Sequence, residues 1–452
     1  MSLFGTDGIR GVAGKPPFTV ETLKAIGFAS GQILLSKQAG NKTTSPVILI
    51  GRDTRESGPW IEEALSEGLS LSGCQVYCCG VIPTAAISVL LKRNHFLGGS
   101  VISASHNPPE FNGVKFFSSD GGKILESWEK EIGALVLKLG AGTKLGTVPL
   151  GTVPNFISAE SDYVQFLKEA CTPSFSMKGV QWVLDCANGS ASLVAPKIFK
   201  FLEAELITIG DKPNGKNINV GCGALHLDLL REAVVKNCAF GGCAFDGDAD
   251  RVLFVDEKGE ILDGDLLIAL AAEDLKEKGE LTGNCVVATV MANFGFFQWM
   301  KRAGIKVITT PVGDRSVSEK ILETGAKLGG EQSGHIIFGQ YLSTGDGLLT
   351  ALKILQTLVA KGKKLSHYRE IYPKTPQVLL NLKVKEKVPI ENLPNLNQLI
   401  QSCKNNLGEN GRLLVRYSGT EPLLRIMVEG SSLSEIQKMA STIAESAKAV
   451  LQ

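Results

Sequence analysis

The sequence predicts an α/β protein with three related α/β/α domains with mixed sheets, followed by a smaller α+β C-terminal domain. Apolar runs rich in Val and Ile alternate with helix-like segments, which is typical of mostly parallel sheets covered by helices. One strand-and-loop unit recurs three times along the chain, and the pattern changes after about residue 370. The length of 452 residues agrees with about three domains of roughly 150 residues each.

Each of the three units contains a first strand ending in a polar loop, a second strand, and a third strand that enters another polar loop and a return strand. The segments of the successive units are 47–55, 75–80 and 99–105, then 180–189, 204–210 and 241–246, then 285–295, 305–310 and 328–331. Their uneven spacing indicates a triplicated domain and not a solenoid. Because ligands bind beyond the carboxyl ends of strands in open α/β sheets, we expect the third loops to carry the chemistry.

The last part of the chain has a different pattern. A strand at 378–384, a helix at 393–406 and two strands around a turn within 413–428 precede a final helix. That helix opens with the capping box Ser432-Leu-Ser-Glu435. We therefore expect domains at 1–154, 155–256, 257–370 and 371–452.

Composition and charge exclude several classes of protein. The chain has 47 Lys and Arg against 46 Asp and Glu, and this net charge of +1 argues against a nucleic-acid or membrane-surface binder. The N-terminus does not read as a signal peptide, and the uncharged stretches 68–91 and 282–300 are broken by Gly, Pro or Asn. Ten cysteines without metal spacing predict reduced, mostly buried thiols in a cytoplasmic protein.

Ser105 lies in Ser103-Ala-Ser-His-Asn-Pro108, where Asn-Pro stops a strand and leaves the serine in a turn. Its hydroxyl could carry a phosphoryl group, or it could be an ordinary turn serine. Asn112-Gly113 predicts a hairpin turn that returns the chain and places Lys115 near the serine loop. The alternative for Lys115 is a solvated hairpin lysine.

Asp246, Asp248 and Asp250 place three carboxylates within five residues. Because such close like charges repel, a divalent metal with oxygen ligands is the natural explanation, with a surface acidic turn as the alternative. An EF-hand is rejected because Arg251 occupies the position that needs glycine, and because the flanking segments read as strands. Few carboxylates on a hairpin favour Mg²⁺.

Three further motifs have candidate binding residues. In Gly329-Gly-Glu-Gln-Ser-Gly-His335, Glu331 and Ser333 could bind sugar hydroxyls, and His335 could be an acid/base group or a structural histidine. The segment 416–422, with Arg425 beyond it, is a candidate phosphate site because it offers hydroxyls, backbone N–H groups and guanidinium groups. The glycine-rich start contains Asp7 and Arg10, for which a flexible terminus is the alternative.

Together these five motifs, in this order along the chain, resemble the α-D-phosphohexomutase family. The start motif and Gln332, where relatives acting on glucose or mannose phosphates often have Met, resemble the branch that acts on glucosamine phosphates. The resemblance implies four domains around one cleft. It also implies interconversion of glucosamine 6-phosphate and glucosamine 1-phosphate through a bisphosphate intermediate, for UDP-N-acetylglucosamine synthesis. The implied cofactors are Mg²⁺ and a hexosamine or hexose 1,6-bisphosphate primer.

The resemblance also implies roles for individual residues. Ser105 would be the phosphoserine, and with Asp246, Asp248 and Asp250 it would hold Mg²⁺. Glu331 and Ser333 would bind the sugar, while Arg10, Arg251 and Lys115 would surround the transferring group. Lys115 and His335 are both acid/base candidates. The residues that would grip the non-reacting phosphate are Arg416, Ser418, Gly419, Thr420 and Arg425.

The expected partner is a small sugar phosphate, with no nucleic acid or membrane, and the protein would be a monomer or homodimer. Three alternatives stay open. A phosphomannomutase/phosphoglucomutase would use the same machinery on another sugar. A metal-dependent sugar phosphatase would release inorganic phosphate. A non-catalytic sugar-phosphate sensor is disfavoured because Ser105 and all three aspartates are present.

Overall fold

The computed structural model describes residues 3–5, 7–38, 46–140, 145–146, 153–418 and 422–451. By its contacts the chain forms two compact units. One comprises Met1–Met291 with Ile305–Arg369, and the other comprises Ala292–Gly304 with Glu370–Gln452. In the described parts of the chain, no helix is long and apolar enough to cross a membrane.

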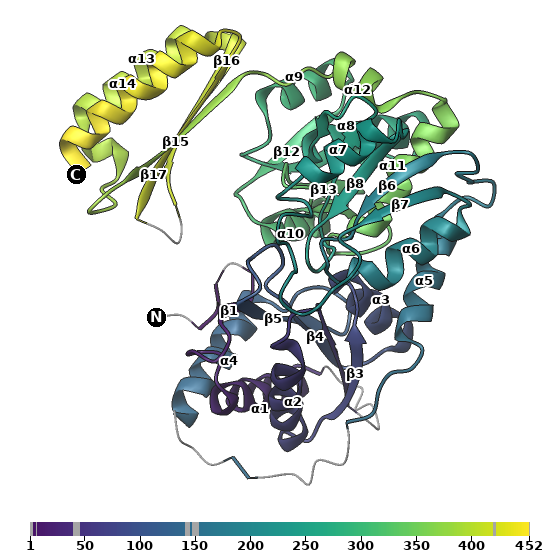
Figure 1. The fold of residues 1–452 in the computed structure, drawn as a ribbon. Helices are drawn as coiled ribbons and strands as arrows, with labels where there is room; N and C mark the ends of the chain where they lie inside the picture. The colour runs from purple at the N-terminus through teal and green to yellow at the C-terminus, as the bar shows by residue number, and fades with distance from the viewer. Residues whose placement is uncertain are drawn as a thin grey trace. The chain divides into compact units, whose positions relative to one another are not determined.

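The first sheet has five strands in the order β1-β5-β4-β2-β3 (Figure 1). Strand β2 is parallel to both β3 and β4, whereas β5 returns antiparallel to β4 and β1 is antiparallel to β5. The strands are β1 (Ile9–Val12), β2 (Val47–Arg52), β3 (Gln75–Val81), β4 (Gly98–Ile102) and β5 (Phe111–Ser118). The accompanying helices are α1 (Val20–Ser36), α2 (Gly58–Leu71), α3 (Thr84–Asn94) and α4 (Glu126–Leu139).

Helices α1 and α2 pack so closely that glycine is needed at their crossing. A Cβ added to Gly27 would lie 2.3 Å from the Leu65 carbonyl oxygen, and one added to Gly68 would lie 2.1 Å from that of Lys24. The two glycines therefore allow the backbones to touch, which brings this helix pair against the hydrophobic core of the first domain.

The second and third sheets repeat the strand order of the first. The order β5-β4-β2-β3 recurs as β9-β8-β6-β7 and as β14-β13-β11-β12, with the return strand antiparallel each time. The second sheet consists of β6 (Gln181–Asp185), β7 (Glu205–Ile209), β8 (Gly241–Phe245), β9 (Val252–Asp256) and β10 (Ile261–Leu262). The third consists of β11 (Cys285–Thr289), β12 (Lys306–Thr310), β13 (Leu328–Gly330) and β14 (Ile336–Phe338). This repetition confirms the triplication predicted from the sequence.

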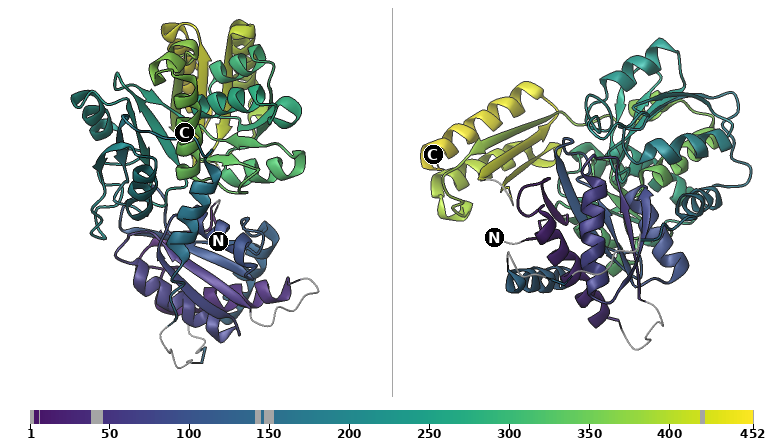
Figure 2. Two further views of the ribbon diagram at one scale, coloured as in Figure 1. Left: turned by 90° about the vertical axis from the view of Figure 1, so that its right-hand side faces the viewer. Right: turned by 60° about the horizontal axis from the view of Figure 1, so that its bottom comes forward.

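Helices lie on both faces of these sheets (Figure 2). The crossovers β6–β7 and β7–β8 run in opposite directions across the second sheet, so right-handed connections put their helices on opposite faces. The helices of this part are α5 (Ala159–Ala170), α6 (Ala191–Phe201), α7 (Asp228–Lys236), α8 (Gly264–Glu277), α10 (Asp314–Thr324), α11 (Gly347–Lys361) and α12 (Leu365–Ile371).

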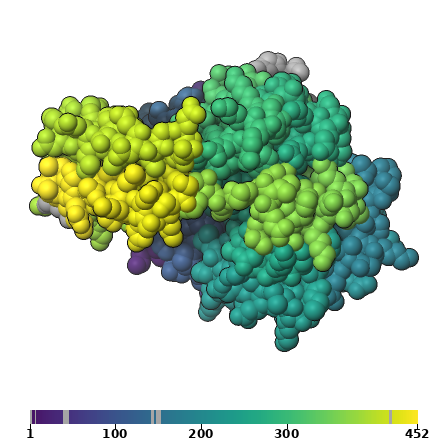
Figure 3. Space-filling view, turned by 90° about the horizontal axis from the view of Figure 1, so that it is seen from above, coloured from purple at the N-terminus to yellow at the C-terminus, as the bar shows by residue number. Residues whose placement is uncertain are grey.

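The C-terminal unit is the predicted small α+β domain. Its antiparallel sheet has the order β15-β17-β16, with β15 (Gln377–Lys383), β16 (Gly411–Tyr417) and β17 (Leu423–Gly430). Helices α13 (Pro394–Leu407) and α14 (Leu433–Leu451) lie side by side, and Figure 3 shows them as one continuous layer of side chains. Helix α9 (Phe294–Arg302) also belongs to this unit. The Ser432 hydroxyl accepts a 3.4 Å hydrogen bond from the Glu435 N–H, as the capping box predicts.

The hairpin turn predicted at Asn112-Gly113 is wrong. Both residues lie inside β5, where Gly113 pairs with Arg10 and Asn112 pairs with Gly11 of β1. Gly113 serves close packing, because a Cβ there would lie 2.3 Å from the Ser103 carbonyl oxygen. The real turn between β4 and β5 is the serine loop itself.

The ten cysteines are all free thiols, as the sequence predicts. Seven are buried, and Cys238 alone is exposed.

Candidate functional site

Ser105 lies in the loop between β4 and β5 and is 1% exposed. Its backbone φ of +53° is unusual for a residue with a side chain. The Ser105 hydroxyl donates to Asp246 Oδ2 at 2.6 Å. The Ser105 N–H donates to the Ser103 hydroxyl at 2.9 Å, and that hydroxyl donates to Asp53 at 2.6 Å. The predicted serine is therefore held against the predicted metal loop.

A buried arginine fixes the backbone of the serine loop. The Arg55 guanidinium pairs with Asp53 at 2.9 Å, and both side chains are completely buried. The same guanidinium donates to four carbonyl oxygens of the loop, those of Ser105, Asn107, Pro108 and Phe111. From the second domain, the Asn219 side-chain amide donates to the Ser105 carbonyl at 2.9 Å.

Sequence reasoning missed both of these residues. Arg55 ends the polar loop after the first strand of its unit, and that place in the repeat was its only signal. Asn219 has none, because it acts on a loop more than one hundred residues away.

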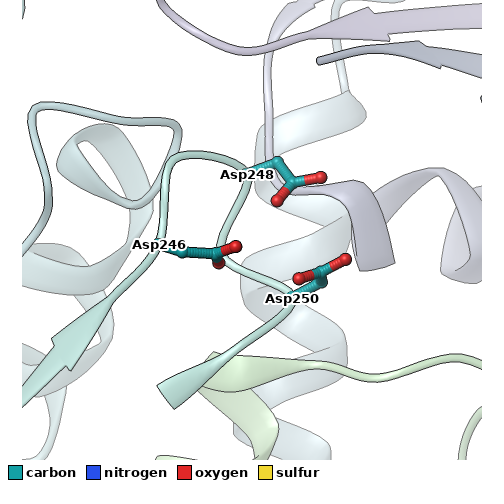
Figure 4. Close-up of side chains that lie close together, drawn as sticks. All are labelled: Asp246, Asp248 and Asp250. Carbon is teal, nitrogen blue, oxygen red and sulfur yellow. The ribbon is translucent and has the colours of Figure 1, made fainter. Parts of the chain in front are cut away.

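Asp246, Asp248 and Asp250 lie in the loop between β8 and β9, and their side chains converge (Figure 4). All three are buried, and one oxygen from each lies within 4.8 Å of those of the others. The Oδ1 atoms of Asp248 and Asp250 are buried and have no hydrogen-bond partner among the described residues. Such an all-oxygen set with unused ligand atoms fits a hard divalent cation.

The surroundings of the triad shift the pKa values of Asp246 and Asp250 in opposite directions. Burial and the neighbouring Asp250 and Asp248 carboxylates raise the pKa of Asp246 well above its usual value. Burial also disfavours ionisation of Asp250, but Lys115 and His335 hold the pKa of Asp250 well below its usual range. Crowded carboxylates of this kind need a cation to be ionised together.

Lys115 lies on β5 and points to the acidic loop. Its ammonium group lies 3.0 Å from Asp248, 3.1 Å from Asp250 and 3.1 Å from Asp7. These three carboxylates outweigh the effect of burial and raise the pKa of Lys115 well above its usual value. The solvated-lysine alternative is therefore wrong, because Lys115 is 2% exposed.

The two predicted arginines lie nearby. Arg10 Nη2 donates to Asp7 at 2.7 Å. The backbone N–H of Arg251 donates to Asp246 at 3.2 Å, and its Nε lies 3.9 Å from Asp250. Arg10 is on β1 and Arg251 immediately precedes β9, so two domains each supply one cation.

The loop between β13 and β14 contains Glu331, Ser333 and His335. Glu331 accepts a 3.0 Å hydrogen bond from the Gly313 N–H, and the buried Ser333 hydroxyl has no partner among the described residues. The His335 Nε2 accepts from the Gly345 N–H at 3.1 Å, so the proton of the neutral ring is on Nδ1, which lies 3.7 Å from Asp250. The three third-strand loops thus meet at the aspartates, as the sequence predicts.

The candidate phosphate loop belongs to the C-terminal unit. Arg416 and Arg425 are cross-strand neighbours on β16 and β17, and burial together with Arg425 lowers the pKa of Arg416. Two adjacent guanidinium groups favour an anion between them. Ser418 is buried, and its carbonyl accepts from Lys387 at 2.7 Å. Gly419 and Thr420 lie outside the described residues.

Comparison with known proteins agrees with this organisation. Models of the phosphoglucomutase/phosphomannomutase alpha/beta/alpha domains I, II and III match residues 1–141, 161–259 and 263–375, and the model of the C-terminal domain matches 379–446. The phosphoglucosamine mutase of Chlamydia trachomatis is 43% identical over 443 residues, covering 98% of this chain and 96% of the relative. That of Caldicellulosiruptor saccharolyticus is 45% identical over 450 residues, covering 98% of each.

Solved structures show the same fold. A phosphoglucomutase/phosphomannomutase family protein from Burkholderia thailandensis is 25% identical, with a TM-score of 0.80, and the match covers 100% of this chain and 98% of that one. Aspergillus fumigatus N-acetylphosphoglucosamine mutase, solved with GlcNAc-6P and magnesium, is 19% identical, with a TM-score of 0.68 and coverage of 99% and 96%. At that identity the likeness concerns the fold alone.

Proposed function

The chain belongs to the phosphoglucomutase/phosphomannomutase family, and from this premise we propose that it interconverts glucosamine 6-phosphate and glucosamine 1-phosphate. It is an isomerase of the phosphohexomutase kind. The observation that carries the proposal is the Ser105 hydroxyl held 2.6 Å from a carboxylate of the buried aspartate triad. The choice of glucosamine is supported by the names of the relatives that are 43% and 45% identical over nearly the whole chain.

Ser105 is the proposed phosphoryl carrier. Phosphorylated Ser105 gives its phosphoryl group to the free C1 hydroxyl of glucosamine 6-phosphate, so the Ser105 Oγ–P bond breaks and a new O–P bond forms. The hydroxyl proton leaves to a base, and the departing Ser105 oxygen takes up a proton from an acid. Lys115 and His335 are the candidates for these two roles. The resulting bisphosphate turns over, and its 6-phosphoryl group returns to Ser105. No inorganic phosphate is released in this cycle, and a hexosamine or hexose 1,6-bisphosphate primes the enzyme.

Asp246, Asp248 and Asp250, with an oxygen of phosphorylated Ser105, are the proposed ligands of Mg²⁺. Their unused carboxylate oxygens and all-oxygen chemistry suit this ion. When bound, Mg²⁺ would neutralise charge that develops on the transferred group. Arg55 and Asn219 hold the geometry of the serine loop, which places the Ser105 hydroxyl beside Asp246.

The remaining predicted residues complete the proposal. Arg10, Arg251 and Lys115 stabilise the equatorial oxygens during transfer, because phosphoryl transfer depends mainly on positioning and charge. Glu331 and Ser333 bind sugar hydroxyls. The non-reacting phosphate is gripped by the C-terminal loop, whose predicted residues are Arg416, Ser418, Gly419, Thr420 and Arg425. The proposal also includes domain limits at residues 154, 256 and 370. It further includes a cytoplasmic location for the protein.

The test compares turnover of glucosamine, glucose and mannose phosphates by the purified protein with a bisphosphate primer. We expect glucosamine 1-phosphate and 6-phosphate to interconvert with the highest kcat/KM. A strong preference for mannose 1-phosphate or glucose 1-phosphate would instead assign the protein to the phosphomannomutase/phosphoglucomutase branch. Stoichiometric release of inorganic phosphate would assign it to the phosphatases.

A further inference from the structure

Lys123 occupies a position that sequence reasoning did not single out. It follows β5 and precedes α4, and its side chain is 14% exposed. Its ammonium group contacts two carboxylates, those of Asp7 and Asp314. Asp7 precedes β1 in the first domain, whereas Asp314 is the first residue of α10 in the third. The single ammonium group of Lys123 therefore pairs with one carboxylate from each of two domains.

Each of these carboxylates contacts an acid/base candidate. Asp7 lies 3.1 Å from the ammonium group of Lys115, and Asp314 lies 3.9 Å from His335 Nε2. On the far side, Lys115 lies 3.1 Å and His335 lies 3.7 Å from Asp250. Acidic and basic side chains thus alternate around a closed ring of six, in the order Asp250, Lys115, Asp7, Lys123, Asp314 and His335.

Charge, more than packing, holds this ring in place near Lys123. A cavity of about 330 Å³ is lined by Lys123, Asp314 and His335, with Trp128 in its wall. Side chains on that side have room to move. Without a cation between them, the Asp7 and Asp314 carboxylates would repel each other in a largely buried position, where such repulsion is weakly screened.

We propose that Lys123 is a positioning residue that holds Lys115 and His335 in their places across the first and third domains. It acts on Lys115 through the ion pair with Asp7, and on His335 through the charge of Asp314, whose carboxylate lies 3.9 Å from Nε2 and beyond hydrogen-bond distance. Lys123 does not itself touch the reacting groups. The inference rests on the proposed mutase function, because it concerns the geometry of that site. The ring extends beyond the family motifs and beyond the aspartate triad, because Lys123 and Asp314 belong to neither.

The experiment compares Lys123→Met, Lys123→Arg and the matched control Lys130→Met in the full-length protein. Lys130 lies on α4, seven residues further along, and forms an exposed pair with Glu126. We expect Lys123→Met to lower kcat about 100-fold while KM changes less than about threefold, because misplaced groups slow chemistry without removing substrate contacts. Lys123→Arg should recover most of the activity, and Lys130→Met should stay within about twofold of wild type.

A kcat for Lys123→Met within about threefold of wild type would overturn the proposal. So would a KM that rises in proportion to the loss of kcat, or a Lys123→Arg protein no better than Lys123→Met. If Lys123→Met does not fold, Asp314→Asn removes the same link from the other side and carries the same expectations. Where both single variants fold, the double variant Lys123→Met/Asp314→Asn should lose no more activity than Lys123→Met alone, because each substitution breaks the same ring. Additive losses of activity in the double variant would contradict the proposal.

A structural readout separates this inference from the proposed function. In a crystal structure of Lys123→Met, the carboxylate of Asp7 or Asp314 should have turned away from its neighbour in the ring. Unchanged positions of both carboxylates would refute the positioning role. If wild type has no mutase activity the proposed function fails, whereas normal wild-type activity with an active Lys123→Met protein refutes only this inference.

Discussion

Removing the guanidinium of Arg55 should destabilise the first domain more than an ordinary substitution. In Arg55→Met, Asp53 would lose its guanidinium partner while keeping the Ser103 hydroxyl and remaining completely buried, and breaking a buried ion pair from one side costs about 3–5 kcal/mol. Four carbonyls of the serine loop would also lose a donor, at about 1 kcal/mol or more each where water cannot replace it. We expect a loss of at least about 5 kcal/mol in the free energy of unfolding.

Denaturation by urea, followed by a probe in the first domain, measures this loss. The matched control is Arg93→Met, which breaks the exposed pair of Arg93 with Glu169 and should cost less than about 1 kcal/mol. Adding Asp53→Asn to Arg55→Met should restore part of the stability, because it removes the uncompensated buried charge. A loss below about 2 kcal/mol for Arg55→Met would refute the reasoning, since it would mean that the guanidinium is not needed to hold the loop.

Three further predictions concern the neighbouring loops. A Cβ at Gly247 would lie 2.6 Å from the Ser105 carbonyl oxygen, so Gly247→Ala should lower kcat about 100-fold, whereas Gly146→Ala, with nothing within 4 Å, should leave it unchanged. Burial raises the pKa of Asp346 from 3.8 to about 6, so the folded state retains a proton between these pH values that the unfolded state has lost. Denaturation from pH 4 to pH 7 should therefore show wild type losing roughly 3 kcal/mol relative to Asp346→Asn as pH rises from about 4 to about 6, with little further change above, whereas parallel pH curves would contradict this. After chelation, Asp248→Asn should need at least about tenfold more Mg²⁺ than wild type for half-maximal turnover, and an unchanged Mg²⁺ titration would exclude Asp248 as a ligand.

The repeated fold could be predicted from the sequence because its signals are local. Apolar strands, polar loops and their order recur three times, and the structure has the same strand order in three sheets. The failure at Asn112-Gly113 has a physical cause. The dipeptide matches a hairpin turn, but packing of Gly113 against the Ser103 carbonyl and pairing with β1 override that preference.

The candidate site was predictable to the extent that its residues form short motifs. Three aspartates in five residues identify a candidate metal loop, and the structure brings their oxygens together with Ser105. Arg55, Asn219 and Lys123 were not predictable in this way. Each acts on residues distant in sequence or on backbone carbonyls, and neither kind of contact leaves a local pattern.

The central claim is that Ser105 carries the phosphoryl group that is exchanged with the sugar. The most direct measurement mixes protein phosphorylated on Ser105 with an equimolar amount of glucosamine 6-phosphate and follows the intact mass of the protein and the phosphorylated products in a single turnover. The account predicts that the protein first loses one phosphate as glucosamine 1,6-bisphosphate appears and then regains one as glucosamine 1-phosphate forms, with almost no inorganic phosphate. It also predicts that Ser105→Ala neither takes up phosphate nor turns over. Transfer of the phosphate to water, or an active Ser105→Ala protein, would contradict it.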